Sequence, residues 1–464
     1  MGKFIVTQEP IISVSGLRGI VGGTLTPDVA FRYATAFAGT LSAGPLLVTR
    51  DGRANGPGLV TPIVAGLSLN GTRRVLDGGI AATPTTGVLI KQHRCAGGIQ
   101  ISASHNPAEY NGMKLFSSEG RVVPANVGEA VLGRYRAQDA GCVPSEVGRG
   151  AKSEEVADTT GRHLAMIEKI VDVDHIRAKK FRVLLDANHG SGSVLGRPLL
   201  KRLGCEVILL GEVADGLFAH EPEPTAENLA TVLTHVTKAG AQIGFCQDPD
   251  ADRLAIIDER GHYLGEEYTL ALAVDYVLRS TPGPVVTNCS TSRMTEDLAR
   301  KYGVPFSRSA VGEANVVDKM LRESAVIGGE GNGGVIDPRV VLVRDSFVGM
   351  ALVLAAMAER DLPISALADE LPRYAIHKSK LTVAREAVVQ VLDSLERHFS
   401  DAVSDRLDGL RLDWTHADGS GSWLLIRASN TEPVVRIIAE APTSVEAQRL
   451  CDESAAVMNS NSKS

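Results

Sequence analysis

The feature that most limits the fold of this chain is a recurring pattern, in which a short apolar run is followed by a loop of small or polar residues. Examples are GPLLVTRDGR, GGIQISASHN, FRVLLDANHGSG, AQIGFCQDPDAD and GPVVTNCSTS, and helix-like stretches such as TEDLARKYG lie between such runs. Alternating strands and helices favour α/β units with mostly parallel sheets, whose sites lie in the loops after the strands. The functional residues are therefore expected in these loops.

The length of the chain, 464 residues, exceeds what one hydrophobic core normally serves, so several domains are expected. The pattern predicts three α/β domains at 1–152, 153–257 and 258–371, and a smaller α+β domain at 372–464. In the last domain, SWLLIRASNTEPVVRIIAEA predicts two strands that flank a polar loop, and TSVE predicts a capping box that begins a closing helix.

Charge and composition exclude several classes of protein. The net charge of -7 is spread along the chain without basic or acidic blocks, which argues against nucleic-acid partners and anionic membranes. The six cysteines lie far apart without metal-ligand spacing, and we expect reduced thiols in a cytoplasmic protein. We also expect no export signal and no membrane span, because no basic and apolar leader and no long apolar stretch occur.

The first loop of interest ends the apolar run in GGIQISASHNPAEYNGMKLF, residues 97–116. Ser104 follows a predicted strand and precedes His105 and an Asn-Pro turn, so we expect its hydroxyl to be exposed and held by a stiff backbone. Such a serine can act as a nucleophile or carry a phosphate. An isolated Ser-His-Asn-Pro can equally be a turn whose serine only caps the backbone. A hydrolase elbow of the form G-x-S-x-G is absent.

The second loop, DPDADR, places three carboxylates within five residues directly after the apolar IGFC. Asp248, Asp250 and Asp252 alternate with other residues, so an extended loop can turn all three inward, and a hard cation such as Mg²⁺ would neutralise them. A calcium EF-hand would require glycine where Arg253 stands and helices as flanks. The alternative is a solvated acidic turn.

Two further loops carry polar groups suited to a sugar phosphate. GGEGNGG (residues 328–334) presents Glu330 and Asn332 among glycines that permit close backbone approach, although such turns are often only structural. RASNTEP (residues 427–433) offers a cation, hydroxyls and backbone N–H groups that match phosphate oxygens, although it can be an ordinary hairpin. The candidate phosphate-binding residues of this last domain are Arg427, Ser429, Asn430, Thr431 and Arg436.

Together, in this order, the four loops resemble those of the α-D-phosphohexomutase family, and the resemblance covers nearly the whole chain. SASHNP with YNGMK is similar to the family's phosphoserine loop, DPDADR to its metal loop, GEGNGG to its sugar-recognition loop and RASNTEP to its phosphate loop. SGLRGIVGG resembles the opening motif, which places Arg18 beside the serine. The resemblance implies three α/β domains with mixed sheets, a smaller C-terminal α+β domain and a central active-site cleft.

The resemblance also implies a reaction. Ser104 would carry a phosphoryl group, and Mg²⁺ would be bound by Asp248, Asp250, Asp252 and an oxygen on Ser104. The enzyme would convert hexose 6-phosphate to 1-phosphate through a hexose 1,6-bisphosphate, which also serves as activator. Arg18, Lys114 and Arg253 would surround the phosphoryl group, and Lys114, or else His105, would relay the proton of the sugar hydroxyl.

Two departures from the family pattern bear on the sugar. Asn332 stands where the family commonly has Ser, Gly334 where it often has His, and AVGEANVVDKM puts Glu313, after Gly312, where some members have His. With RDSFVG, these features resemble the phosphoglucosamine mutases, although similar loops occur in phosphoglucomutase/phosphomannomutases. Glucosamine 6-phosphate is the expected substrate, because Glu313 can face the C2 ammonium, unless this carboxylate only caps its own helix.

Two other functions remain alternatives. A metal-dependent sugar phosphatase would release free phosphate from Ser104, but it has no need of a separate C-terminal phosphate loop. A non-catalytic sugar-phosphate-binding protein would be expected to have lost the serine or an aspartate. The expected partner is a small-molecule sugar phosphate, and the chain is expected to be a monomer or a homodimer.

Overall fold

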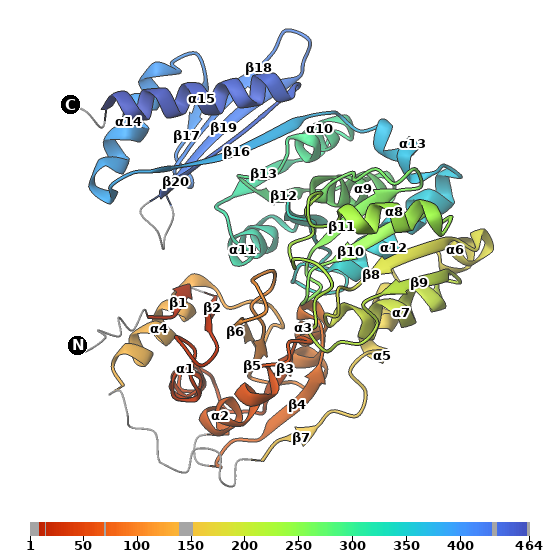
Figure 1. Cartoon of the computed structure of the whole chain (residues 1–464), viewed down its shortest axis with the longest axis vertical. Coiled ribbons are helices and arrows are strands. Elements are labelled where there is room, and N and C mark those ends of the chain that lie inside the picture. Colours follow the sequence, from red (N-terminus) through yellow and green to blue (C-terminus); the bar gives the residue numbers. More distant parts are fainter. Residues whose placement is uncertain (1–8, 14, 69–70, 139–151, 429–433, 462–464) are drawn as a thin grey trace. The chain divides into compact units, whose positions relative to one another are not determined.

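A computed structural model of the chain describes residues 9–13, 15–68, 71–138, 152–428 and 434–461 (Figure 1). These residues form two compact units. The first contains the described residues up to Val277 together with Asn332–Ala368, and the second contains Leu278–Gly331 and the chain from Asp369 onward. Among the described residues, no helix is both long and apolar enough to cross a membrane.

The first unit begins with a seven-stranded mixed sheet of order β1-β2-β6-β5-β3-β4-β7. The parallel strands of this sheet are β3 (Leu46–Arg50), β4 (Val75–Ile80), β5 (Gly97–Ile101) and β7 (Glu154–Glu155). The antiparallel strands are β1 (Ile11–Ser13), β2 (Gly16–Ile20) and β6 (Tyr110–Ser117). Its helices are α1 (Pro27–Ala38), α2 (Pro57–Ser68), α3 (Thr83–Gln92) and α4 (Ala125–Arg136). Tyr33 and Phe37 of α1 pack with Ile99 and Leu115 of the sheet in one buried core.

A second sheet of the first unit has four strands in the order β11-β10-β8-β9. These strands are β8 (Arg182–Asp186), β9 (Glu206–Leu210), β10 (Ile243–Gln247) and β11 (Leu254–Asp258). Only β11 is antiparallel to its neighbour. The remaining elements of the unit are α5 (Gly161–Ile167), α6 (Val173–Lys179), α7 (Gly192–Arg202), α8 (Ala230–Lys238), β15 (Gly334–Ile336) and α12 (Ser346–Arg360). Two helices, α9 (Glu266–Ser280) and α13 (Ile364–Asp369), reach the unit boundary.

The second unit contains three parallel strands and an antiparallel sheet. β12 (Val285–Asn288) pairs in parallel with β13 (Phe306–Ser309) and β14 (Ile327–Glu330), with helices α10 (Met294–Lys301) and α11 (Glu313–Glu323). The antiparallel sheet has the order β16-β20-β19-β18-β17. Its strands are β16 (Ala375–Thr382), β17 (Val403–Asp405), β18 (Leu410–Thr415), β19 (Gly421–Ala428) and β20 (Val434–Ala441).

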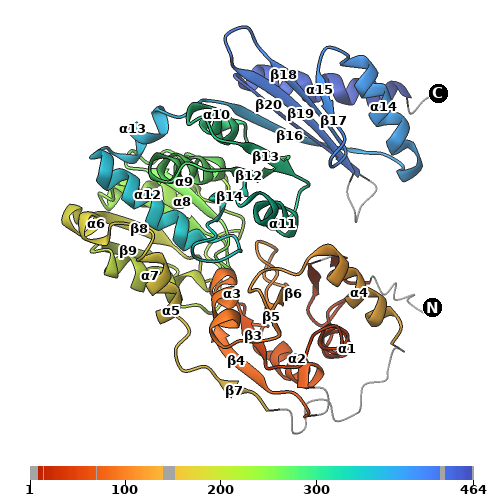
Figure 2. The same ribbon diagram turned by 180° about the vertical axis from the view of Figure 1, so that it is seen from behind.

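One face of the antiparallel sheet is covered by α14 (Val388–His398), which follows the short 3-10 helix η1 (Arg385–Ala387), and by α15 (Ser444–Asn461) (Figure 2). Leu395 of α14 and Leu450 of α15 share a buried core with Leu424 and Ile437 of the strands. Thr443 Oγ1 accepts a hydrogen bond from the backbone N–H of Glu446, so the predicted cap of the closing helix is present.

The mixed character of the first two sheets has a local cause. β6 and β11 follow their neighbouring strands after only short loops, between Ile101 and Tyr110 and between Gln247 and Leu254. A parallel connection needs a crossover of a dozen or more residues, so each short loop forces its two strands to be antiparallel. These two hairpin loops carry the serine and the three aspartates.

Candidate active site

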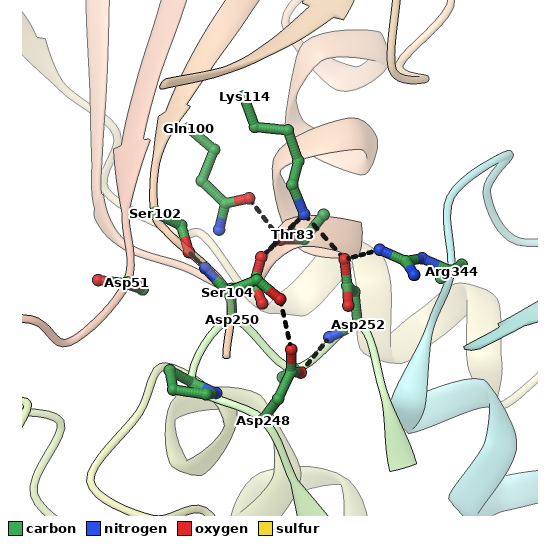
Figure 3. A network of polar contacts seen from close by, with 12 residues as sticks. Asp51, Thr83, Gln100, Ser102, Ser104, Lys114, Asp248, Asp250, Asp252 and Arg344 are labelled. Atoms are coloured by element: carbon green, nitrogen blue, oxygen red, sulfur yellow. Dashed lines mark hydrogen bonds and ion pairs between the residues drawn. The ribbon is translucent and has the colours of Figure 1, made fainter. Parts of the chain in front are cut away.

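The serine loop follows β5 as the sequence predicts, but the serine hydroxyl is not exposed. Ser104 is 1% exposed, and its Oγ donates a hydrogen bond to Asp248 Oδ2 over 2.8 Å (Figure 3). The expectation of an exposed hydroxyl is wrong because the aspartate loop covers it. The backbone φ of Ser104 is +50°, a left-handed conformation that is uncommon for a residue with a side chain.

The three aspartates of the second loop converge, as their spacing predicts. Asp248, Asp250 and Asp252 are fully buried, and one oxygen from each lies within 4.8 Å of the others. Asp248 Oδ1 accepts the backbone N–H groups of Asp252 and Arg253, both over 3.1 Å, so the loop curls around its first carboxylate. A solvated acidic turn is therefore excluded.

Two cations offset part of this negative charge. Lys114 of β6 donates to Asp250 Oδ2 over 2.9 Å and to Asp252 Oδ2 over 2.8 Å (Figure 3). Arg344 donates to the same Asp252 oxygen over 2.7 Å. The backbone N–H of Thr83, in the first turn of α3, donates to the backbone carbonyl of Asp250, which places the loop at the positive end of that helix.

The carboxylates differ in their protonation because their surroundings differ. Burial, followed by the charges of Asp250 and Asp252, raises the pKa of Asp248 well above its usual range. Burial acts in the same direction on Asp250, but Lys114 and the hydroxyl of Thr83 outweigh it and lower the pKa of that carboxyl. Asp248 therefore holds its proton to a higher pH than Asp250 does.

The same residues fit a hard divalent cation. The Oδ1 atoms of Asp250 and Asp252 are buried and have no hydrogen-bond partner. Buried carboxylate oxygens without donors are costly unless a cation binds them, and Mg²⁺ prefers oxygen ligands. The donor set thus suits Mg²⁺.

Three further predicted residues lie around the serine. Arg18 donates from Nη1 to Asn106 Oδ1 over 3.0 Å, and His105 Nδ1 lies 3.4 Å from Ser104 Oγ. Burial, followed by the charges of Arg253 and Arg18, lowers the pKa of His105 to about 2, so its ring is neutral near pH 7. Arg253 Nε is buried without a hydrogen-bond partner and lies 4.0 Å from Asp248 Oδ2, beyond hydrogen-bond range.

A second group of predicted residues comes together in the second unit. Glu330 Oε1, at the end of β14, accepts hydrogen bonds from Asn288 Nδ2 over 2.7 Å and from the backbone N–H of Gly312 over 3.2 Å. Asp408 Oδ2 accepts from the backbone N–H of Val311 and from Arg427 Nε, over 2.9 and 2.8 Å. Asp408 thereby joins the segment before α11 to the arginine of the expected phosphate loop.

Arg427 belongs to a row of cations across the antiparallel sheet. Arg436 of β20 stands opposite Arg427 of β19 on one side and Lys380 of β16 on the other. Residues directly opposite one another share a face with closely spaced Cβ atoms, so like charges there repel unless an anion binds. Ser429, Asn430 and Thr431, predicted in the adjoining loop, lie outside the described residues.

The two residues that bear on the sugar lie in different environments. Glu313 is the first residue of α11, where a carboxylate is also stabilised by the helix N-terminus. The capping alternative for Glu313 therefore stays open. Asn332 belongs to the first compact unit, and its Oδ1 is buried without a hydrogen-bond partner.

Several residues of these clusters were missed from the sequence: Thr83, Asn288, Arg344, Lys380 and Asp408. Asn288 ends the apolar run of GPVVTNCSTS, so its position at the end of a predicted strand was a signal that could have identified it. Arg344 begins RDSFVG and had no such signal. No local pattern distinguishes Lys380 or Asp408. Strand pairing places Lys380 opposite Arg436, and a hydrogen bond joins Asp408, in the loop before β18, to Arg427.

Four protein-family models match consecutive stretches of the chain. They are the phosphoglucomutase/phosphomannomutase alpha/beta/alpha domains I, II and III, at residues 10–141, 161–261 and 265–374, and the phosphoglucomutase/phosphomannomutase C-terminal domain at 380–457. The expected fold class is thereby confirmed: three domains with α/β sheets and a smaller antiparallel C-terminal domain.

Relatives match over nearly their whole length. A "Phosphoglucomutase/phosphomannomutase" of Thermococcus kodakarensis is 35% identical, over 93% of this chain and 95% of the relative. A "Probable phosphoglucosamine mutase" of Methanopyrus kandleri is 32% identical, over 98% and 97%. The solved structure of a phosphoglucomutase/phosphomannomutase family protein from Burkholderia thailandensis has a TM-score of 0.80 and 26% identity, over 97% of this chain and 98% of that chain. Domain composition, site residues and full-length relatives agree, and the chain belongs to the phosphoglucomutase/phosphomannomutase family of phosphohexomutases.

Proposed function

We propose that this phosphohexomutase converts glucosamine 6-phosphate to glucosamine 1-phosphate through a phosphoserine at Ser104 and a 1,6-bisphosphate. The observation that carries the proposal is the contact of Ser104 Oγ with Asp248 at a buried cluster of three carboxylates. A serine against such a cluster suits transfer of a highly charged group more than acyl chemistry, for which the loop lacks a catalytic triad pattern. In this proposal each expected domain contributes one loop.

Mg²⁺ would be held by Asp248, Asp250 and Asp252 with an oxygen on Ser104. When bound, the metal would offset negative charge on the phosphoryl group during transfer. Lys114, Arg344 and Arg253 supply the remaining positive charge from three different segments of the chain. Arg253 Nε, which has no hydrogen-bond partner, would donate to an oxygen of the phosphoryl group.

The transfer balances without a co-substrate. The bond between phosphorus and Ser104 Oγ breaks, and a bond forms from phosphorus to the oxygen of the free sugar hydroxyl. The Lys114 ammonium would relay the proton, because it donates one proton to Ser104 Oγ and takes up that of the sugar hydroxyl. The bisphosphate then reorients and returns its other phosphate to Ser104, with the proton passing back to the product hydroxyl. We assign the proton relay to Lys114. The alternative relay is His105, whose ring is neutral and whose Nδ1 lies 3.4 Å from Ser104 Oγ.

The second unit would bind the part of the substrate that does not react. Lys380, Arg436 and Arg427 form a row of cations that suits a phosphate dianion. Glu330, fixed by Asn288, suits sugar hydroxyls, and Glu313 suits the C2 ammonium of glucosamine. The free thiols of the described cysteines fit our assignment of the enzyme to the cytoplasm.

The reaction is tested with substrate labelled in its phosphate. A mutase returns all label as isomerised sugar phosphate and is activated by hexose 1,6-bisphosphate, whereas a sugar phosphatase releases inorganic phosphate. Stoichiometric release of free phosphate with no isomer would overturn the proposal.

The sugar is tested by comparing kcat/KM for the 6-phosphates of glucosamine, glucose and mannose in wild type and Glu313→Gln. We expect wild type to prefer glucosamine, and Glu313→Gln to lower this preference by about tenfold, because one charged interaction is lost. A tenfold preference of wild type for glucose or mannose contradicts the choice of sugar. An unchanged preference in Glu313→Gln contradicts only the role of Glu313.

A further inference from the structure

Arg53 lies in the loop after β3, and all the nitrogens of its guanidinium group donate hydrogen bonds to the serine loop or to one neighbouring carboxylate. Nη2 donates to the backbone carbonyls of Ser104 and Asn106 over 2.7 and 2.6 Å. Nη1 donates to the carbonyls of Pro107 and Tyr110 over 2.7 and 3.1 Å. Nε donates to Asp51 Oδ2 over 3.2 Å, so all five N–H bonds of the side chain have acceptors.

The arginine is itself held in place. Asp51 is fully buried, and its second oxygen accepts the backbone N–H of Arg53 over 3.0 Å. The ring of Phe218 lies 5.0 Å from the guanidinium carbon, and a Cβ on Gly216 would lie only 2.5 Å from Arg53 Cα. Arg53 is 1% exposed, so these neighbours enclose it almost completely.

Hydrogen bonds connect the backbone carbonyl and the backbone N–H of Ser104 to Arg53 and Asp51. The carbonyl of Ser104 accepts from Arg53, and its backbone N–H donates to Ser102 Oγ over 2.9 Å. The Ser102 hydroxyl hydrogen-bonds to Asp51. Ser104 has a φ of +50°, a strained conformation that persists only where surrounding contacts enforce it. Asp51 and Arg53 supply those contacts.

We propose that Arg53, oriented by Asp51, is a positioning residue that holds the loop from Ser104 to Tyr110 so that Ser104 Oγ faces Asp248. Arg53 contacts the loop only through backbone carbonyls, and it sets the rate of phosphoryl transfer through the direction of the serine side chain. The inference rests on the proposed function of Ser104 as phosphoryl carrier.

A lysine cannot replace this arginine. Its ammonium has three donors at one point, whereas the four carbonyls and Asp51 are spread around a planar fork. Arg53→Lys keeps the charge but leaves buried acceptors unpaired and the loop free to shift, and a displacement of about 1 Å can lower a rate by about a hundredfold.

The chain offers a matched control in Arg73. Its guanidinium donates to the backbone carbonyls of Ala38, Leu41 and Ser42, so it also holds a loop, but that loop carries no residue of the site. Both arginine-to-lysine variants lose backbone hydrogen bonds. Only the variant at Arg53 loosens the serine loop.

The experiment compares steady-state and single-turnover kinetics of wild type, Arg53→Lys and Arg73→Lys, with thermal unfolding of each. We expect Arg53→Lys to lower kcat by about 10- to 100-fold with KM for the hexose phosphate within about twofold. Transfer of labelled phosphate from Ser104 to sugar should slow by the same factor. Arg73→Lys should keep the wild-type kcat, although its midpoint of unfolding should be similar to that of Arg53→Lys.

Should Arg53→Lys not fold, Asp51→Asn gives a second measurement, because it leaves Arg53 in place and removes only the charge that orients it. A kcat lowered by about threefold or more at unchanged KM supports the inference. Wild-type kcat in Arg53→Lys, or in Asp51→Asn where the first variant does not fold, overturns it. Full activity of wild type without phosphate on Ser104 instead overturns the proposed function, which separates the two failures.

Discussion

Ser104 Oγ donates a hydrogen bond to Asp248 Oδ2 over 2.8 Å, although 144 positions separate the two residues in the chain. This contact joins the hairpin loop of the first sheet to that of the second. We predict that active protein carries phosphate on Ser104, and that Ser104→Ala abolishes turnover while unfolding at the wild-type midpoint. Intact-mass measurement and peptide mapping check the phosphate, and full activity with an unmodified Ser104 would contradict the prediction.

Removal of one carboxylate from the proposed metal site should affect turnover more than sugar binding. We predict that Asp250→Asn lowers kcat by at least about a hundredfold with little change in KM, because the charge on the phosphoryl group is less neutralised in the transition state. Mn²⁺ binding, followed by electron paramagnetic resonance, should weaken in parallel. Asp174→Asn, an exposed aspartate paired with Arg177, is the control that should change neither quantity. Undiminished wild-type rates in excess chelator would argue against a metal.

Lys114 should oppose metal binding while it supports turnover. Its ammonium lies within 2.9 Å of two carboxylates that would bind the cation, so the two positive charges repel. We predict that Lys114→Met lowers kcat by at least about a hundredfold yet tightens Mn²⁺ binding by about tenfold. Titration calorimetry of the two proteins measures the second effect. Weaker metal binding in Lys114→Met would show that the lysine organises the site rather than competing for it.

Arg427 should contribute to affinity. We predict that Arg427→Ala weakens binding of both monophosphate and bisphosphate by about 10- to 100-fold, because one charge-assisted hydrogen bond contributes about 1.5–3 kcal/mol. More bisphosphate should escape per turnover. Arg449→Ala, which removes an exposed helical pair with Glu453 in the same domain, is the matched control. Unchanged affinity and unchanged escape in Arg427→Ala would assign the phosphate to other residues.

Asp51 should make stability and activity respond to pH in opposite directions. Burial outweighs Arg53 and raises the pKa of Asp51 from 3.8 to about 6. Between these values the unfolded chain has lost the proton that the folded protein still holds, so the free energy of unfolding falls as the pH rises through this window. The fall corresponds to about 3 kcal/mol, and this contribution is constant above about pH 6.

The activity should fall as the pH drops below about 6, because a neutral Asp51 no longer orients the guanidinium of Arg53. Urea unfolding and kcat, each measured from pH 4 to pH 8 for wild type and Asp51→Asn, check both trends. Asp51→Asn should lack both the change in the free energy of unfolding and the change in kcat that Asp51 causes in this pH range. Parallel pH profiles for the two proteins would assign the dependence to other groups.

Local sequence was sufficient to predict much of the fold and the positions of the candidate site loops. Short apolar runs followed by polar turns predicted the strands that precede Ser104 and Asp248 and the strand on which Arg427 lies, and alternate spacing predicted that the three aspartates point inward together. These features depend on residues within one strand and its turn, where the order of apolar and polar side chains determines which of them are buried.

Contacts between distant segments decided the rest. The burial of Ser104, the pairing of Lys114 with two aspartates, the row of Lys380, Arg436 and Arg427, and the arginine that holds the serine loop each join positions far apart in the chain. Such pairs leave no local pattern, because a hydrogen bond requires the two groups to be about 3 Å apart, and only sheet order and loop packing set that distance. The sequence alone therefore predicted the candidate residues for the chemistry, and the tertiary structure determined which of them come together and which groups hold them.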